Sequence, residues 1–155
     1  MDITAFLAGD LSEIRVPAII NPFGWSYGTS ANQVNVVYAD SITLTDGGND
    51  TLDLFAGGLL DIFGRTMTMS AIKLLYVKNT STDSGLTIGG GVATDLLIFA
   101  DTSDKVLVPS GGIFMWADPS AAGVVTTARN NLYLLDDGTG EAGDKIVQVI
   151  AMGLD

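Results

Sequence analysis

The stretch QVNVVYADSITLTDGGNDTLDL, Gln33–Leu54, decides the fold class. Apolar and polar side chains alternate along it, with Val34, Val36, Tyr38, Ile42 and Leu44 on the apolar side. A period of two residues is typical of a strand with one buried face. The segment Asp46-Gly47-Gly48-Asn49 in its middle fits a tight turn, because glycine and asparagine tolerate positive φ. The stretch therefore predicts two strands joined as a β-hairpin.

The rest of the chain repeats this pattern. RTMTMSAIKLLYVKN, Arg65–Asn79, begins with alternation and becomes apolar on both faces at Leu74–Val77, which indicates a central strand. Short apolar segments such as DLLIFAD, KVLVP, GGIFMWAD, NLYLL and DKIVQVIAMG follow, separated by Gly-, Ser- and Asp-rich turns. The 19 glycines disfavour helix. We therefore expect an all-β fold, an antiparallel β-sandwich or jelly roll of about eight to ten short strands.

The first 32 residues lack a sustained period of 2 or 3.6 and contain two prolines. We expect residues 1–32 to form an extended N-terminal arm and residues 33–155 to form the sandwich domain. An arm cannot bury large apolar side chains on itself, so it packs either on its own sheet or on a neighbouring subunit. The predicted interface residues are Ile14, Val16, Ile19, Ile20, Phe23, Trp25 and Tyr27.

Charge and composition limit the classes of partner. The chain has 7 basic and 18 acidic residues, a net charge of −11, so its long-range field repels phosphates and disfavours a nucleic-acid partner. No run of 18 apolar residues and no basic leader occurs, so neither a membrane span nor export is expected. Charged residues make up only 16% of the chain and mean hydropathy is +0.38. This composition predicts apolar surface buried against a partner.

The sequence lacks several of the residue types that catalytic sites commonly use. The absence of His and Cys removes the Ser-His-Asp and Cys-His triads and the usual zinc ligands. Most Asp residues stand beside Gly, Ser, Thr or Asn, where they form turns. Gly138, Gly140 and Gly143 match a dinucleotide-binding spacing, but the β-branched segment after them cannot supply the required helix. We therefore expect a protein that is not an enzyme and needs no cofactor.

One stretch suggests a metal. Gly47–Leu52 resembles one unit of the calcium-binding nonapeptide of RTX toxins, and Asp46, Asn49, Asp50 and Asp53 would supply oxygen ligands. RTX sites need several stacked repeats, however, and this chain has one. Turn chemistry accounts for the same residues without an ion. The sequence therefore favours the hairpin and predicts no metal site.

From about Val34 onward, five motifs occur in a characteristic order. ITLTDGGNDTLDL, IKLLYVKNTS, LTIGGG, DKVLVPSGGIFMWADP and NNLYLLDDGTGEAGDKIVQVIAMG follow one another. This order resembles a group of small bacteriophage and prophage virion proteins. The resemblance covers roughly the last three-quarters of the chain and carries no catalytic signature.

The resemblance implies a β-sandwich structural component of a phage particle. The function that it favours is capsid decoration, in which a cement protein made in the host cytoplasm stabilises the shell from the capsid surface. The expected partners are the major capsid protein and further copies of the chain, as a homotrimer or another homo-oligomer. The alternatives are a tail or head-fibre component and a receptor- or carbohydrate-binding virion module, for which Trp25, Trp116 or Tyr133 would form the platform.

Overall fold

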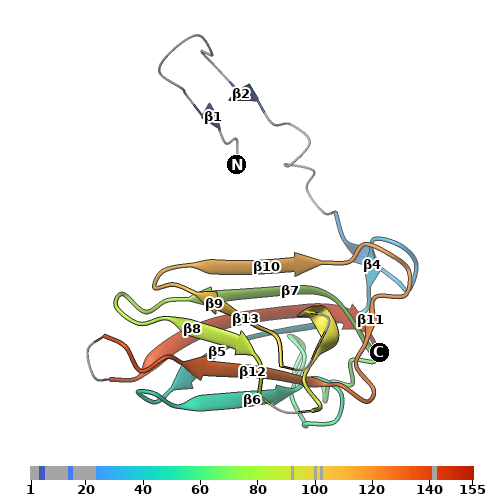
Figure 1. Cartoon of the computed structure of the whole chain (residues 1–155). Helices are drawn as coiled ribbons and strands as arrows, with labels where there is room; N and C mark the ends of the chain where they lie inside the picture. Colours follow the sequence, from blue (N-terminus) through green and yellow to red (C-terminus); the bar gives the residue numbers. More distant parts are fainter. Residues whose placement is uncertain are drawn as a thin grey trace.

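The computed structural model describes residues 4–5, 14–15, 24–91, 93–99, 101, 103–140 and 143–155. Two antiparallel sheets lie one against the other (Figure 1). Sheet I has the order β10-β7-β13-β5, formed by β10 (Ile113–Ala117), β7 (Ala71–Asn79), β13 (Lys145–Leu154) and β5 (Val36–Leu44), with the short β11 (Val124–Val125) paired to β7. Sheet II has the order β6-β12-β8-β9, formed by β6 (Asn49–Asp53), β12 (Asn131–Asp136), β8 (Leu86–Gly89) and β9 (Lys105–Val108).

Smaller elements complete the described chain. Strands β1 (Thr4–Ala5) and β2 (Ile14–Arg15) pair antiparallel with each other. Strands β3 (Ser26–Tyr27) and β4 (Gln33–Val34) form a parallel pair just before β5. A single 3-10 turn covers Leu97–Phe99.

Strand pairing in the two sheets is nested. The first strand, β5, pairs with the last, β13, and β6 pairs with β12. Inside them β7 pairs with β10, and β8 forms a hairpin with β9. The chain is thus a long double ribbon rolled up so that β13 also pairs with β7 and β12 with β8. This is the connectivity of a jelly roll, so the predicted fold class is confirmed, as is the central position of β7 between β10 and β13.

The predicted hairpin at residues 46–49 is wrong. The turn itself is present, with φ of 63° at Gly47 and a hydrogen bond from Gly48 N to Thr45 O at 2.7 Å. The strands that it joins do not pair with each other, because β5 belongs to sheet I and β6 to sheet II. Gly47 N instead donates to Asp136 Oδ2 at the end of β12, at 2.8 Å. Glycines of the kind that would close a hairpin instead carry the chain from sheet I to sheet II at this turn.

The core lies between the sheets and follows the alternation of each strand. Leu75 and Val77 of sheet I and Ile88 and Leu134 of sheet II are completely buried. Met67 and Met69, in the long connection before β7, fill one end of the same cluster. Methionine adapts its shape to irregular gaps, which suits a segment that is not itself a strand.

A buried lysine anchors the segment that leads into the sandwich. Lys73 of β7 is 0% exposed, and its Nζ donates to Ser30 O at 2.9 Å and to Gln33 O at 2.8 Å. The same Nζ lies 5.7 Å from the centre of the Trp25 ring, which allows a cation–π contact. Two carbonyls and an aromatic face thus replace the water that the ammonium loses on burial. Residues 25–33 are thereby held against their own domain.

Tyr38 makes the folded state sensitive to alkali. Burial raises the pKa of its phenol to about 12, with further contributions from the charge of Asp40, a hydrogen bond with Asp40 and the charge of Asp50. Because the folded pKa lies above the unfolded value of 10, the stabilisation is complete below pH 10 and is lost as the pH rises towards 12. We expect about 1 to 3 kcal/mol of unfolding free energy to disappear over that interval.

Urea unfolding at pH 9, 10, 11 and 11.5 measures this loss, and absorbance of tyrosinate follows the ionisation itself. Tyr38→Phe should flatten the pH dependence, whereas Tyr27→Phe, at a residue 85% exposed, should leave it unchanged. Equal slopes for wild type and Tyr38→Phe would show that other groups cause the alkaline loss.

Candidate interaction surface

The outer face of sheet I carries two complete rows of apolar side chains. Residues at alternate positions to Leu75, Val77, Val149 and Ala151, which are buried in the core, face away from it. Strand register aligns them across the sheet from β10 to β5. The first row is Met115, Tyr76, Ile150 and Ala39, and the second is Ala117, Leu74, Met152 and Val37. We call these eight residues the apolar face.

The apolar face is open to solvent over part of its area. Met115 is 57% exposed and Ala39 is exposed, whereas the side chains on the two inner strands are half-buried by their neighbours. The next row along the strands is mostly polar, with Lys78, Gln148 and Ser41 beside Ile113. The apolar face therefore has a polar border on this side, which is typical of a protein interface.

The outer face of sheet II differs. Its outward positions mix apolar Leu107, Tyr133 and Leu135 with polar Asn49, Thr51, Asp53, Thr87 and Lys105. This mixture is what a solvated sheet face normally shows. Among the residues that the structure describes, the contrast between the two faces marks sheet I as the side with unpartnered apolar surface.

Strand β10 adds a free backbone edge to sheet I. Asn79 N donates to Gly112 O at 3.0 Å and Asp118 N donates to Lys73 O at 2.8 Å, just outside the two ends of the β10–β7 ladder. Hydrogen-bonded pairs alternate along an antiparallel ladder, so the N–H and C=O groups of Ile113, Met115 and Ala117 point away from β7. No other described strand pairs with this edge. Such an edge can accept another strand.

The predicted interface residues fall into three groups. Val16, Ile19, Ile20 and Phe23 lie outside the described residues, and Ile14 lies in β2, where only the backbone is described. Trp25 is half-buried against Lys73 of its own domain. Tyr27 is 85% exposed. Of the predicted set, Tyr27 is therefore the residue whose described side chain is open to a partner.

The weak calcium set is not brought together. Alternation along β6 directs Asp50 to the side of buried Leu52, whereas Asn49 and Asp53 face outward. Asp53 Oδ1 accepts hydrogen bonds from Phe55 N, Ala56 N and Asn130 Nδ2, which fixes it as a turn residue. Within the part of the chain that the structure describes, no three carboxylates are grouped so as to hold a metal ion.

A polar pocket of about 310 Å³ opens where the β7–β8 loop meets the start of β13. Asp83, Asp144 and Lys145 line it together with hydroxyl side chains. Lys145 Nζ lies 3.1 Å from Asp83 Oδ1, and this hydrogen bond is the main cause that raises the pKa of Lys145. The lysine therefore stays charged, which makes it unsuited to act as a base or nucleophile. Ser81 Oγ also donates a hydrogen bond to Asp83. The ion pair between Asp83 and Lys145 is therefore suited to holding the β7–β8 loop in place.

The aromatic residues considered as a sugar platform are not displayed as one. Trp116 faces inward and packs on the core. Tyr133 is half-buried, and Gly91 packs so closely on it that a Cβ atom added to Gly91 would lie only 2.5 Å from Tyr133 Cγ. Trp25 covers Lys73. Trp116 lies in β10, Tyr133 in β12 and Trp25 just before β3, and the three side chains do not form one exposed plane.

Sequence reasoning missed the apolar face, although a signal for it existed. Leu74 and Tyr76 alternate with the buried Leu75 and Val77, which was interpreted only as a central strand. In a two-layer sandwich each sheet has one outward face, so a strand that is apolar on both faces implies a covered outer face. The pattern of β13, with Ile146, Ile150 and Met152 outward, carries the same signal.

A scan of the chain against models of protein families finds no match, and a search among curated proteins finds none either. In the described part of the chain no helix is both long and apolar enough to cross a bilayer.

Proposed function

We propose that this chain is a non-enzymatic structural protein of a phage particle, a capsid decoration protein that binds the shell through the apolar face of sheet I. The observation that carries the proposal is the pair of apolar rows running from edge to edge of that sheet. The resemblance of the last three-quarters of the chain to small virion proteins is the reason for proposing a phage particle.

Physical chemistry supports an interaction role. Covering apolar surface gains roughly 25 cal/mol per Å², and such contiguous surface on a domain usually marks a binding site. The net charge of −11 keeps the protein away from packaged nucleic acid, so the partner is protein. A jelly roll is rigid because each strand of its sheets is hydrogen-bonded to a neighbour, which lowers the ordering cost of binding. The major capsid protein is the proposed partner.

Co-sedimentation with purified shells tests the proposal. Ile150 lies in the centre of the apolar face, and Ile150→Lys should raise the dissociation constant for shells at least tenfold because a charge would be desolvated there. The matched control is Leu107→Lys on sheet II, at a residue 61% exposed, which should bind like wild type. Addition of a calcium chelator should change nothing.

Three results would contradict this function. Wild-type protein that stays in the supernatant would remove the capsid role, and equal binding by Ile150→Lys would remove the role of the apolar face. Loss of binding after addition of the chelator would show that a metal ion takes part in the contact. Thermal unfolding of both variants ensures that the comparison is made between folded proteins.

A further inference from the structure

The methionines that the structure describes differ widely in their access to water. Met67 and Met69 are 3% and 0% exposed and belong to the core cluster, whereas Met115 is 57% exposed on the outer side of β10. Met152 is half-buried on β13, between the flanking strands β7 and β5. A dissolved oxidant must reach the sulfur through water, so oxidation of a thioether follows its exposure. Met115 is therefore the described methionine that is most open to oxidation.

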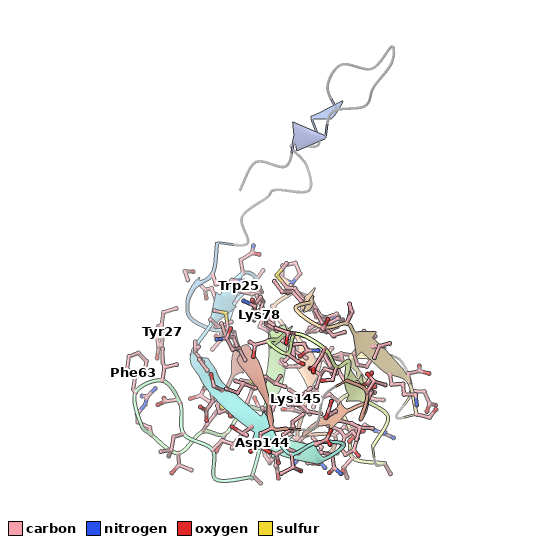
Figure 2. All side chains as sticks on the ribbon, turned by 90° about the vertical axis from the view of Figure 1, so that its left-hand side faces the viewer. Trp25, Tyr27, Phe63, Lys78, Asp144 and Lys145 are labelled. Atoms are coloured by element: carbon pink, nitrogen blue, oxygen red, sulfur yellow. The ribbon has the colours of Figure 1, made fainter. Side chains whose placement is uncertain are left out.

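Met115 stands at the end of the first row of the apolar face. Strand register aligns it with Tyr76 and, across β7, with Ile150 of β13. The next row is the polar border, in which Lys78 (Figure 2) pairs with Ile113 of β10. Because β10 is an edge strand, no other described strand of the two sheets covers Met115 from the far side. Water therefore reaches this side chain both from the border and from the edge.

Oxidation would turn this apolar side chain into a polar one. A peroxide transfers one oxygen atom to the thioether: the O–O bond breaks, an S–O bond forms, the sulfur loses two electrons and, from hydrogen peroxide, water leaves. In the free protein, solvent can hydrate the new sulfoxide oxygen, because Met115 is more than half exposed. Against an apolar partner the same oxygen would lose its water without gaining a hydrogen bond, which is unfavourable.

We propose that Met115 is a reversible oxidation site that controls docking on the apolar face. The thioether form docks, and the sulfoxide form does not. A methionine sulfoxide reductase reverses the change, since its dithiol supplies two electrons, becomes a disulfide and releases the oxygen as water. This inference rests on the proposed function, because docking of the shell on the apolar face is the step that the sulfoxide blocks.

The surroundings of Met115 confine the chemical change to one position. The other outward residues of β10 are Ile113 and Ala117, whose hydrocarbon side chains do not react with dilute peroxide. Met67 and Met69 lie in the core, where a sulfoxide would disrupt packing, but their burial shields them. Mild oxidation can therefore alter the binding surface and leave the fold intact.

Peptide mapping by mass spectrometry measures where peroxide reacts. Full-length protein is treated with dilute hydrogen peroxide at neutral pH, and each oxidised methionine is found in a peptide that is heavier by one oxygen atom. Met115 should react roughly tenfold or more faster than Met67 and Met69, and faster than half-buried Met152. If any of these three reacts as fast as Met115, the assignment of the site is wrong.

Co-sedimentation with purified shells measures the effect on docking, as the ratio of the dissociation constants after and before peroxide treatment. In wild type the dissociation constant should rise about tenfold or more, and Met152→Leu, which keeps Met115, should show the same rise. Met115→Leu has no thioether at this position, so its dissociation constant should not change on treatment. Each protein is compared with its own untreated form, so an effect of the substitution itself does not enter the ratio.

Two controls separate a local oxidation from damage to the fold. Thermal unfolding of treated wild type should match that of untreated protein, and a large fall in its melting temperature would show that oxidation acts through the fold instead. Incubation of treated wild type with methionine sulfoxide reductases for both sulfoxide epimers and with dithiothreitol should restore binding to shells. Binding that stays lost after Met115 is reduced would contradict a reversible site.

The results separate this inference from the proposed function. Treated wild type that binds as tightly as untreated protein, or a loss of binding that Met115→Leu shares, overturns the oxidation control even where Ile150→Lys loses binding to shells. Untreated wild type that does not bind shells overturns the proposed function, and the control of docking falls with it.

Discussion

Replacement of Asn79 by aspartate is expected to remove a large part of the free energy of unfolding of the domain. Asn79 is 2% exposed at the end of β7, and its Nδ2 donates to Ser84 O at 2.8 Å and to Val108 O and Pro109 O at 3.3 Å. Aspartate would place a negative oxygen against three carbonyl oxygens in a buried site. The cost should reach about 3 to 5 kcal/mol, against a typical total stability of about 5 to 15 kcal/mol.

Urea unfolding followed by far-UV circular dichroism measures this cost. Asn79→Leu removes the hydrogen bonds without adding charge, and it should be less damaging than Asn79→Asp. Asn49→Asp makes the same chemical change at an exposed position of β6, where we expect a change below about 0.5 kcal/mol. An Asn79→Asp protein within 1 kcal/mol of wild type would show that the loop between β7 and β8 rearranges freely.

Asn79 and Lys73 show what the sequence could not predict. The alternation of β7 places Lys73 and Asn79 on the same inward side as Leu75 and Val77, so the sequence predicts that both side chains face inward. Their burial could not be predicted, because it depends on carbonyls of residues far away in the chain. These are Ser30 and Gln33 for the lysine and Val108 and Pro109 for the asparagine. A single sequence carries the periodicity of each strand but not these partners.

The strands and the fold class were predictable because they depend on local alternation and turn chemistry. The nested pairing was not, because it joins β5 to β13 and β6 to β12 across nearly the whole domain. The turn after Leu44 illustrates the limit. A Gly-Gly turn between alternating strands is equally compatible with a hairpin and with a step between sheets, and only the distant strand β12, through Asp136, decides between them.

The exposed turn at Leu59–Arg65 was missed for a related reason. LLDIFGR, Leu59–Arg65, has no sustained period, and single exposed apolar residues are normal on any protein. Ile62 and Phe63 lie in a turn whose backbone is fixed by Asp61 Oδ1, which accepts hydrogen bonds from Phe63 N and Arg65 N. That information appears only when the backbone has folded around the carboxylate.

Lys73→Ala is expected to destabilise the domain and release the segment that leads into it. The substitution removes a fully buried four-carbon stem and leaves the carbonyls of Ser30 and Gln33 without their donor. Lost burial and unpaired carbonyls together should cost about 3 to 5 kcal/mol. Trp25, which loses the ammonium over its ring, should become more exposed, so its fluorescence should shift to longer wavelength.

Lys73→Met separates packing from charge, because it keeps most of the stem volume but has no donor. We expect a smaller loss of global stability than for Lys73→Ala, since the desolvation cost of a buried ammonium also disappears. Cleavage by chymotrypsin after Trp25 or Tyr27 should nevertheless be at least tenfold faster than in wild type, because the carbonyls that held the segment are unpaired. Lys78→Met, on the outward side of the same strand, is the matched control. Equal cleavage rates for Lys73→Met and Lys78→Met would show that contacts other than the buried ammonium hold residues 25–33 on the sandwich.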